Sequence, residues 1–381
     1  MKKIIHRTLK LEHHLELGKV MILYGARQVG KTTLVKTLLD KTACRYAFYT
    51  GDDIPFATDF GKCDLQILRN IVDGLDMLVI DEAQKIERIG TALKLLVDHF
   101  PDLYVIVTGS SSFDLANSTE EPLTGRKNVH TLYPLAWSEI AANQTAWEAG
   151  RRLEEFLIYG SYPEVASLDS RKDKENRITE IKNSYLIKDI LEFQLLKRSH
   201  VVLDLLKLLA FQIGSEVSTV ELGKQLGLDN KTVQRYLDLL EKSFVLVCLH
   251  GFSRNLRKEV SKMKMYYFMD PGIRNAVIAN FNPLDMRNDA GQLWENYMIL
   301  ERIKRNAYSE KKANYYYWRT YDQKEIDLIE ESGGRLRGFE FKWNPHRKAK
   351  EPKEWVQTYE NATWELVTPE NYIEFLSDRG S

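Results

Sequence analysis

Residues Gly25 to Thr32 read GARQVGKT, a stretch that fits the pattern G-x-x-x-x-G-K-[ST]. An apolar run, Val20–Tyr24, precedes it, and a helical pattern, Thr33–Leu39, follows it. A phosphate-binding loop requires this strand–loop–helix context, because the glycines let successive backbone N–H groups point at phosphate oxygens. The stretch therefore predicts a nucleotide-binding loop, a Walker A motif, and decides the fold of the first part of the chain.

The chemistry of this loop assigns a role to individual side chains. Lys31 is expected to reach the β- and γ-phosphates, and Thr32 is expected to offer its hydroxyl to Mg²⁺. The expected ligands are therefore ATP and Mg²⁺. The residues expected to bind the nucleotide are Gly25, Ala26, Arg27, Gln28, Val29, Gly30, Lys31, Thr32, Thr33 and Ser110.

A second motif, MLVIDE from Met77 to Glu82, is an apolar strand that ends in two carboxylates. Asp81 is expected to hold Mg²⁺ through its water shell, and Glu82 to activate the attacking water as general base. An acidic pair after a strand also suits a helix N-terminus, which favours negative charge. Its position downstream of the phosphate loop favours a Walker B strand.

Two later segments leave alternatives open. The run Tyr104–Thr108 is followed by Gly109-Ser110-Ser111, where Thr108 or Ser110 would sense the γ-phosphate or orient water, or else cap an ordinary turn. Arg126 precedes the next apolar run and is either an arginine finger that stabilises transition-state charge, in its own chain or in a neighbouring one, or a solvated loop residue.

Apolar runs alternate with helical patterns over residues 1–150, which is typical of a parallel α/β sheet covered on both faces. The runs are Val20–Tyr24, Tyr46–Thr50, Met77–Ile80, Tyr104–Thr108 and Val129–Leu132. We therefore expect an α/β fold, with the parallel sheet of a P-loop NTPase in this first domain.

The composition excludes several classes of protein. The chain has 381 residues, 44% of them hydrophobic and 28% charged, which excludes a disordered chain and a collagen-like fibre. Lys and Arg number 54, as do Asp and Glu, so no global field attracts nucleic acid or membrane. Three scattered cysteines indicate a reducing cytoplasm, and no apolar run approaches the ~18 residues of a membrane helix.

At this point the chain resembles a group of prokaryotic AAA-type ATPases related to the signal-transducing STAND ATPases. The resemblance rests on GARQVGKTTL, LVIDEAQKI, VTGSSSF and LTGR, in this order and with similar spacing, and it continues through YGSYPEV and GFEFKW. It covers nearly the whole chain. It implies a C-terminal domain of unknown function that looks like a restriction endonuclease.

The rest of the chain is predicted to form three segments, a helical lid over 151–200, a winged-helix-like segment over 201–280 and a small α/β PD-(D/E)xK nuclease-like domain over 281–381. In the winged-helix segment, one helix is expected over Thr219–Leu226 and a second over Lys231–Glu241, with a break at Gly227. Apolar residues recur at helical spacing on the second helix, so their face is expected to be buried. These residues are Val233, Tyr236, Leu237 and Leu240.

Basic residues follow this helix pair. Lys231, Gln234 and Arg235 would face outward, where a recognition helix meets the major groove. The stretch Ser253–Met265 carries a net charge of +4 from Arg254, Arg257, Lys258, Lys262 and Lys264 against Glu259, which suits a phosphate-binding wing. Winged helices also serve as protein-docking modules, and a charged run is often only a solvated face, so DNA contact and protein contact both stay open.

The run GFEFKW places Glu340 and Lys342 on one face of a strand. Asp327 lies on the preceding predicted strand and would join them only if the two strands pair. Together with Glu295 on a helix, these residues match the D…ExK set of restriction-like nucleases, in which Asp327 and Glu340 would bind Mg²⁺ and Lys342 would activate water. Nearby basic residues would hold the nucleic-acid backbone: Arg335, Arg337, Arg347, Lys348 and Lys350.

Two functions remain at this stage. The first is an ATPase that couples nucleotide state to DNA binding or cleavage by the nuclease-like domain. The second is an ATP-dependent switch or scaffold that binds protein partners, with a nuclease-like domain whose acids merely pair with local Lys and Arg. A cytoplasmic protein without membrane contact is expected in both cases, and an oligomer is compatible with both.

Overall fold

The computed structural model describes residues 5–110, 123–142, 144–192, 199–254, 264–320, 324–347 and 349–377. The chain forms two compact parts, Arg7–Pro134, here the N-terminal part, and Met1–His6 with Leu135–Ser381, here the C-terminal part. The end of the ATPase core predicted at residue 150 lies instead at Pro134. The segment after it belongs to the C-terminal part, where Leu135 N donates to Ser161 O at 2.8 Å.

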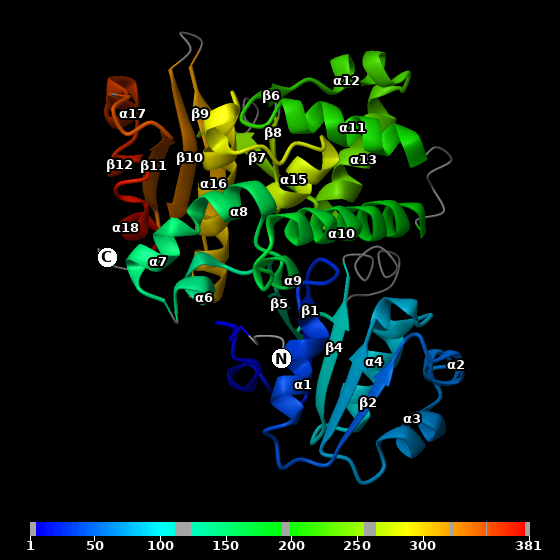
Figure 1. Ribbon diagram of the computed structural model, residues 1–381. Coiled ribbons are helices and arrows are strands. Elements are labelled where there is room, and N and C mark those ends of the chain that lie inside the picture. Colours follow the sequence, from blue (N-terminus) through cyan, green and yellow to red (C-terminus); the bar gives the residue numbers. More distant parts are fainter. Residues whose placement is uncertain are drawn as a thin grey trace. The chain divides into compact units, whose positions relative to one another are not determined.

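A five-stranded parallel sheet organises the N-terminal part (Figure 1). In spatial order its strands are β2 (Tyr46–Thr50), β3 (Met77–Asp81), β4 (Tyr104–Gly109), β1 (Val20–Tyr24) and β5 (Lys127–Thr131). The helices are α1 (Lys31–Leu39), α2 (Ile54–Gly61), α3 (Leu65–Val72) and α4 (Ile89–His99), with short 3-10 helices η1 (Leu11–His13) and η2 (Ala83–Lys85). The predicted strands and the parallel α/β class are confirmed, with strand ends that differ by at most two residues.

Every residue of β1 and β3 is buried, as continuous apolar strands in a covered parallel sheet should be. Because all five strands run in one direction, their carboxyl ends meet at one edge of the sheet. Strand β4 lies between β1 and β3. The end of β4 therefore separates the loop that follows β1 from the acidic pair at the end of β3.

The C-terminal part combines helices with a seven-stranded mixed sheet. Its helices are α6 (Trp137–Ala141), α7 (Ala146–Arg151), α8 (Leu153–Tyr159), α9 (Pro163–Ala166), α10 (Arg171–Glu192), α11 (Ser199–Phe211), α12 (Thr219–Leu226), α13 (Asn230–Lys242), α15 (Pro271–Val277), η3 (Leu284–Met286), α16 (Ala290–Tyr308), α17 (Lys353–Thr358) and α18 (Tyr372–Leu376). In spatial order its strands are β12 (Ala362–Val367), β11 (Arg335–Phe341), β10 (Glu325–Ser332), β9 (Asn314–Arg319), β7 (Leu246–Gly251), β8 (Lys264–Phe268) and β6 (Glu216–Val217). Among the helices described, none has the length and apolar character needed to cross a membrane.

This sheet joins segments that the sequence predicts as separate. Strands β7 and β9 pair in parallel, with His250 opposite Tyr316 and Gly251 opposite Tyr317. The hairpin of the predicted winged-helix segment thus continues into the sheet of the predicted nuclease-like domain (Figure 1). The predicted boundaries at residues 200 and 280 fall inside one compact part.

The helix pair of the middle segment forms where the sequence predicts it. Helix α12 spans Thr219–Leu226, and Gly227 ends it in the left-handed region at φ +64°. The Asp229 side chain caps α13 by accepting from Thr232 N at 2.9 Å. All four apolar residues predicted for the inner face of α13 are buried: Val233, Tyr236, Leu237 and Leu240.

Buried charges fix helix α16 to the start of the C-terminal part. Lys304 Nζ donates to Leu135 O at 3.1 Å, to Ser161 Oγ at 3.2 Å and to Glu301 Oε1 at 2.7 Å. Glu301 Oε2 accepts from Trp137 N at 2.6 Å. Since buried charges are tolerated only when they are paired and hydrogen-bonded, these contacts hold α16 in one place.

Gly160 makes a close approach that no other residue can make. Its φ is +76° and its ψ −169°, a region that is essentially restricted to glycine. A Cβ atom added there would lie 1.9 Å from Asp270 Oδ1. Asp270 is itself buried and accepts from Ser161 N at 2.7 Å, so it has no room to move.

Gly160→Ala is therefore expected to destabilise the protein by about 3–5 kcal/mol. Chemical denaturation followed by circular dichroism measures this change. Gly291→Ala is the matched control, because Gly291 lies in α16 with no atom within 4 Å of the added Cβ. Equal unfolding midpoints for the two variants would contradict the steric argument.

Candidate functional site

The loop between β1 and α1 adopts a conformation that its glycines permit. Gly25 and Gly30 have φ values of +152° and +98°, and Gln28 lies in the left-handed region at +62°. A Cβ atom on Gly25 would lie 2.2 Å from Leu132 O, so this position tolerates only glycine. The loop curls around the N-terminus of α1, where its backbone N–H groups are available to an anion.

Lys31 is buried at the first turn of α1. Its Nζ donates to Gly25 O at 2.8 Å and to Ala26 O at 3.0 Å. The ammonium group is thus held across the mouth of the loop by two backbone carbonyls. A phosphate anion offers this cation stronger acceptors at the same place.

The carboxylate of Asp81 connects the two motifs that the sequence predicts. Its Oδ2 accepts from Thr32 Oγ1 at 2.8 Å, and its Oδ1 accepts from Thr108 Oγ1 in a close contact. Thr108 reaches Asp81 because β4 lies between β1 and β3. A threonine hydroxyl beside a carboxylate, next to a phosphate-binding loop, fits a Mg²⁺ ion that also contacts phosphate.

Glu82 follows Asp81 in the left-handed region, with φ +50° and ψ +41°. Its backbone N donates to Thr108 Oγ1 at 3.4 Å, and Gln84 Nε2 donates to its carboxylate. The same Gln84 group donates to Ser110 Oγ at 3.3 Å. Gln84 therefore joins Glu82 to Ser110, a link that no sequence motif indicates, while Ser111 lies outside the described residues.

Arg126 does not join this group of residues within the chain. Its backbone O accepts from Val20 N at 2.8 Å, which places Arg126 beside the first residue of β1. The nucleotide loop follows the last residue of the same strand. Since β1 and β5 are parallel, Arg126 lies at the opposite edge of the sheet from Lys31. Its guanidinium pairs there with Asp98 at 2.5 Å. Of the alternatives left open by the sequence, this position favours a solvated loop residue or a role toward nucleotide bound in a neighbouring chain.

A second group of charged residues lies on β10, β11 and α16. The alternation predicted for β11 is observed, because Phe339 and Phe341 both pack on Phe375 whereas Glu340 and Lys342 pair with each other at 2.5 Å. Glu340 is buried, and Lys342 is partly exposed. The structure therefore brings the acid and the lysine of the ExK pattern together.

Asp327 joins this pair, since β10 and β11 are antiparallel neighbours. The pairing of β10 with β9 shifts register between Ile326 and Ile329, and such irregularities re-aim side chains. Asp327 Oδ2 accepts from Phe341 N at 2.7 Å. Asp327 thereby lies at the end of β11, beside Glu340 and Lys342.

Glu295 reaches the same group from the first half of α16. Tyr267, on β8, donates its hydroxyl to Glu295 Oε1 at 2.6 Å. This tyrosine is fully buried and comes from the segment predicted as a winged helix. Its contact with Glu295 depends on the continuous sheet, which the sequence does not indicate.

In this group three acids, Asp327, Glu340 and Glu295, act on the charge of Lys342. Burial, together with the charges of Glu295 and Glu340, raises the pKa of Asp327 well above its usual range. Burial also raises the pKa of Glu295 to about 7, and burial raises the pKa of Glu340. Although burial works against it, the charges of Asp327, Glu340 and Glu295 raise the pKa of Lys342. Carboxylates crowded in this way favour an added cation.

Within the described ranges, no three or more His, Cys, Asp or Glu side chains are arranged as a metal centre. A Mg²⁺ ion usually needs only one or two protein carboxylates, with water and phosphate oxygens as further ligands. Asp81 on β3, and Asp327 with Glu340 on β10 and β11, fit that smaller requirement.

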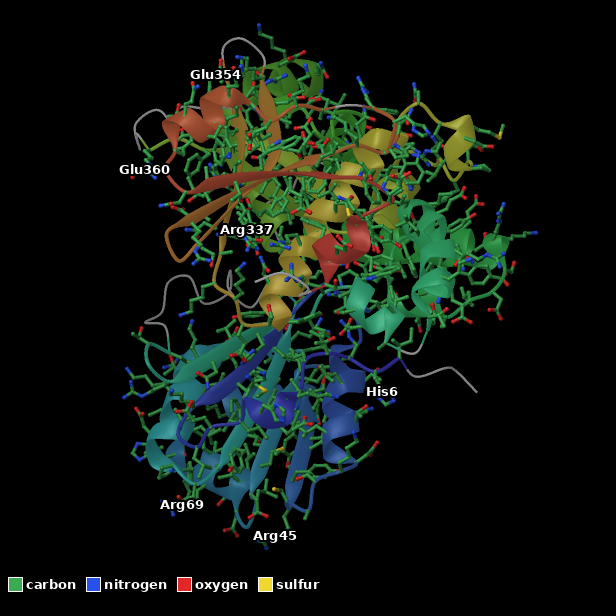
Figure 2. All side chains as sticks on the ribbon, turned by 90° about the vertical axis from the view of Figure 1, so that its left-hand side faces the viewer. His6, Arg45, Arg69, Arg337, Glu354 and Glu360 are labelled. Atoms are coloured by element: carbon green, nitrogen blue, oxygen red, sulfur yellow. The ribbon has the colours of Figure 1, made fainter. Side chains whose placement is uncertain are left out.

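Basic side chains are exposed on the helix pair and beside the acid group. On α13, Lys231 and Arg235 are exposed together with Gln234, as predicted. Arg335, Arg347 and Lys350 are exposed, and Arg337 is half-buried. Arg337, on β11, is labelled in Figure 2. The greater part of the predicted basic wing, residues 255–263, and Lys348 lie outside the described residues.

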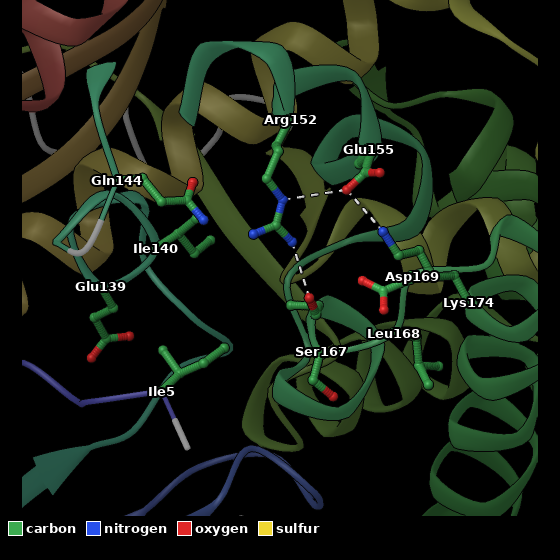
Figure 3. A pocket seen from close by; sticks show the side chains of 11 residues that line it. Ile5, Glu139, Ile140, Gln144, Arg152, Glu155, Ser167, Leu168, Asp169 and Lys174 are labelled. Carbon is green, nitrogen blue, oxygen red and sulfur yellow. Dashed lines mark hydrogen bonds and ion pairs between the residues drawn. The ribbon is translucent and has the colours of Figure 1, made fainter. Parts of the chain in front are cut away.

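A cavity of about 260 Å³ lies among α6, α8, α9 and the start of α10 (Figure 3). Glu155 accepts there from Lys174 Nζ at 2.8 Å and from Arg152 Nε at 3.4 Å. Arg152 also donates to Ala166 O at 3.0 Å. Arg152, Glu155 and Lys174 are thus paired within the protein.

Family models match three stretches of the chain. Residues 17–141 match the family described as an AAA domain. This match supports an AAA-type ATPase for the N-terminal part. Residues 150–284 and 290–374 match two domains of unknown function, DUF8612 and DUF4143. The DUF4143 match carries no nuclease assignment for the C-terminal segment.

The relatives that the comparisons find are uncharacterized proteins. One from Mycobacterium tuberculosis is 28% identical over 339 residues, covering 87% of this chain and 72% of its own length. One from Methanocaldococcus jannaschii is 22% identical, covering 86% of this chain and 75% of its own length. These relatives extend across the AAA-type domain and the segments after it.

Among solved structures, a STAND protein from Pyrococcus horikoshii with a tetratricopeptide repeat sensor matches at a TM-score of 0.29 and 14% identity. The match covers 76% of this chain and 43% of that protein. A DNA replication initiation factor matches at a TM-score of 0.25 and 16% identity, with 61% of this chain and 84% of that one covered. Likenesses at these scores add nothing to the assignment of the AAA-type domain.

Proposed function

We propose that this protein binds ATP with Mg²⁺ at the loop Gly25–Thr32 and hydrolyses it. The observation that carries the proposal is the Asp81 carboxylate, which accepts hydrogen bonds from Thr32 of the loop and from Thr108 of β4. Lys31 would bind the β- and γ-phosphates, while Thr32 and Asp81 would hold the metal and its water. Such a bound Mg²⁺ supplies neutralisation of the charge that develops on the phosphates.

In this proposal Glu82 is the general base. It lies directly after Asp81, and its carboxylate is oriented by Gln84, which also contacts Ser110. Through this link Ser110 would lie beside the attacking water, where it would sense the γ-phosphate. Arg126, at the other edge of the sheet, would act on nucleotide only in a neighbouring copy of the chain.

We further propose that nucleotide state is coupled to DNA binding or cleavage by the C-terminal part. Asp327 and Glu340 would hold Mg²⁺, and Lys342 would activate water or stabilise charge on the phosphate, assisted by Glu295. The support is the assembly of these four residues from three elements, with acids whose pKa values are raised by burial and by neighbouring charges. The exposed basic side chains of α13 would contact the backbone of the nucleic acid.

A switch or scaffold with an inert C-terminal site is the second candidate. The observation that favours it is the ion pair between Lys342 and Glu340, which already neutralises one acid of the group. In this case nucleotide binding would change the exposure of a protein-binding surface, and no nucleic acid would be cut.

Glu82→Gln is expected to retain ATP binding and to lower the rate of hydrolysis by 10²–10⁴-fold, on the order of a general base's contribution. The amide preserves the shape of the side chain and cannot accept the proton of water. Phosphate release under saturating ATP measures turnover, and a fluorescent ATP analogue measures affinity.

Glu87→Gln is the matched control for this substitution, since Glu87 lies five residues further along the chain and is exposed. It is expected to hydrolyse ATP as the wild type does. Equal turnover by wild type and Glu82→Gln would remove Glu82 from the mechanism, whereas no ATP binding by the wild type would refute the proposed function.

A further inference from the structure

Arg7 contacts the nucleotide loop although it precedes that loop by almost 20 residues. Its Nη1 donates to Val29 O at 2.8 Å, and its Nη2 donates to Tyr133 O at 2.5 Å. Both contacts lie within the N-terminal part and are partly buried. One guanidinium group thus joins the nucleotide loop to the segment that follows β5.

The second of these carbonyls is held by the sheet. Leu132 N donates to Tyr24 O at 2.7 Å, which extends the pairing of β5 with β1 by one residue. Tyr133 follows directly, so its carbonyl is anchored to the end of the sheet. When one nitrogen of a planar guanidinium donates to a fixed carbonyl, the position of its other nitrogens is nearly fixed as well. Arg7 therefore holds the Val29 carbonyl in a fixed position relative to the end of the sheet.

The peptide between Val29 and Gly30 gives this contact a consequence for phosphate. In a planar trans peptide the C=O and the following N–H point in opposite directions. No cis peptide occurs among the described residues, so Gly30 N–H points away from Arg7 when Val29 O points toward it. Gly30 O accepts from Leu34 N at 2.9 Å, but the peptide on its N-terminal side precedes a glycine at φ +98°, whose conformational freedom allows that peptide more than one orientation.

We propose that Arg7 is a positioning residue of the ATP site. It holds the Val29–Gly30 peptide in the orientation that presents Gly30 N–H to the bound phosphates. The inference rests on the proposed binding of ATP to this loop and adds to it a residue outside the motif. Arg7 has no contact with the phosphates in this scheme; it fixes in advance a donor that would otherwise have to be ordered by the ligand.

Arg7→Ala is expected to weaken binding of ATP and of inorganic triphosphate, each with Mg²⁺, by about tenfold or more. Arg7→Lys is expected to recover part of this loss, because lysine keeps the positive charge but lacks the planar fork of donors that fixes Val29 O relative to Tyr133 O. Isothermal titration calorimetry gives both affinities. Triphosphate separates the effect on the phosphate cradle from any effect on the nucleoside.

Arg45→Ala is the matched control, since Arg45 is an exposed arginine of the same part that pairs with Asp76. It is expected to bind both ligands as the wild type does. Circular dichroism and the thermal midpoint establish that each variant is folded. If Arg7→Ala does not fold, Arg7→Lys alone decides, with a weaker affinity than wild type as the expected result.

Two outcomes are distinguishable. Wild type that binds neither ATP nor triphosphate would refute the ATP site itself. Wild type that binds both, together with folded Arg7→Ala and Arg7→Lys of unchanged affinity, would overturn the role of Arg7 and leave the proposed ATP site intact.

Discussion

Lys31→Ala is expected to abolish ATP binding, with a loss of affinity of at least about 100-fold. In the structure the Lys31 ammonium lies across the mouth of the loop, on the carbonyls of Gly25 and Ala26. Because it is buried, its charge acts on a phosphate with little screening by water. Alanine removes the cation that the loop motif is expected to direct toward the β- and γ-phosphates.

Titration calorimetry with ATP and Mg²⁺ measures this loss. Lys41→Ala serves as the control, because Lys41 follows α1 as an exposed residue of the same charge. Lys31→Ala also removes two hydrogen bonds within the loop, so its circular dichroism spectrum must match that of wild type. Wild-type affinity in a folded Lys31→Ala protein would show that ATP binds elsewhere or does not use this loop.

The parts of the ATP site that the sequence predicts are those encoded locally. A continuous apolar strand, a glycine loop and a helical pattern are all contained in Val20–Leu39, and the structure reproduces their limits. The acidic pair at Asp81 is equally local. Residues that act through tertiary contacts, such as Gln84 beside Glu82 and Arg7 beside Val29, carry no such signal.

The predicted parallel sheet narrows the alternatives that the sequence leaves open for Arg126. It precedes its strand, whereas Lys31 and Glu82 follow theirs. In a parallel sheet, residues before and after a strand lie at opposite edges. The predicted parallel class therefore already excludes Arg126 from the nucleotide edge of its own chain. The pairing of β1 with β5 places Arg126 at the opposite edge of the sheet.

The acid group of the C-terminal part was predictable to a different degree. Alternation along β11 is a property of any strand, so Glu340 and Lys342 were predicted together. Asp327 required the pairing of β10 with β11 and a register shift within β10, which follow from long-range packing. Tyr267 could not be anticipated, because its segment was predicted as part of a separate module.

Asp327→Asn and Lys342→Ala are each expected to lower metal-dependent DNA cleavage by at least about 10³-fold. Asp327→Asn removes a metal ligand, and its side-chain oxygen still accepts the hydrogen bond from Phe341 N. Lys342→Ala removes the cation that faces three acids. ATP hydrolysis by both variants is expected to stay at the wild-type rate, because the ATP site lies in the N-terminal part.

The stability of Asp327→Asn distinguishes a catalytic role of Asp327 from a structural one. Burial, together with the charges of Glu295 and Glu340, raises the pKa of Asp327, so the ionised form of Asp327 is unfavourable in the folded protein without metal. Asp327→Asn is therefore expected to unfold at the same denaturant concentration as wild type or a higher one, in metal-free buffer. Gain of stability with loss of activity is the behaviour of a site kept for function.

Plasmid nicking and cleavage of linear, branched and single-stranded DNA and of RNA, with Mg²⁺ or Mn²⁺ and with or without ATP, measure the activity. Glu331→Gln is the matched control, because Glu331 lies on β10 at the end remote from Asp327 and pairs with Asn314. Its cleavage is expected to equal that of wild type. If wild type cuts none of these substrates, the nuclease is excluded, and the ion pair of Lys342 with Glu340 then belongs to the ATP-dependent switch.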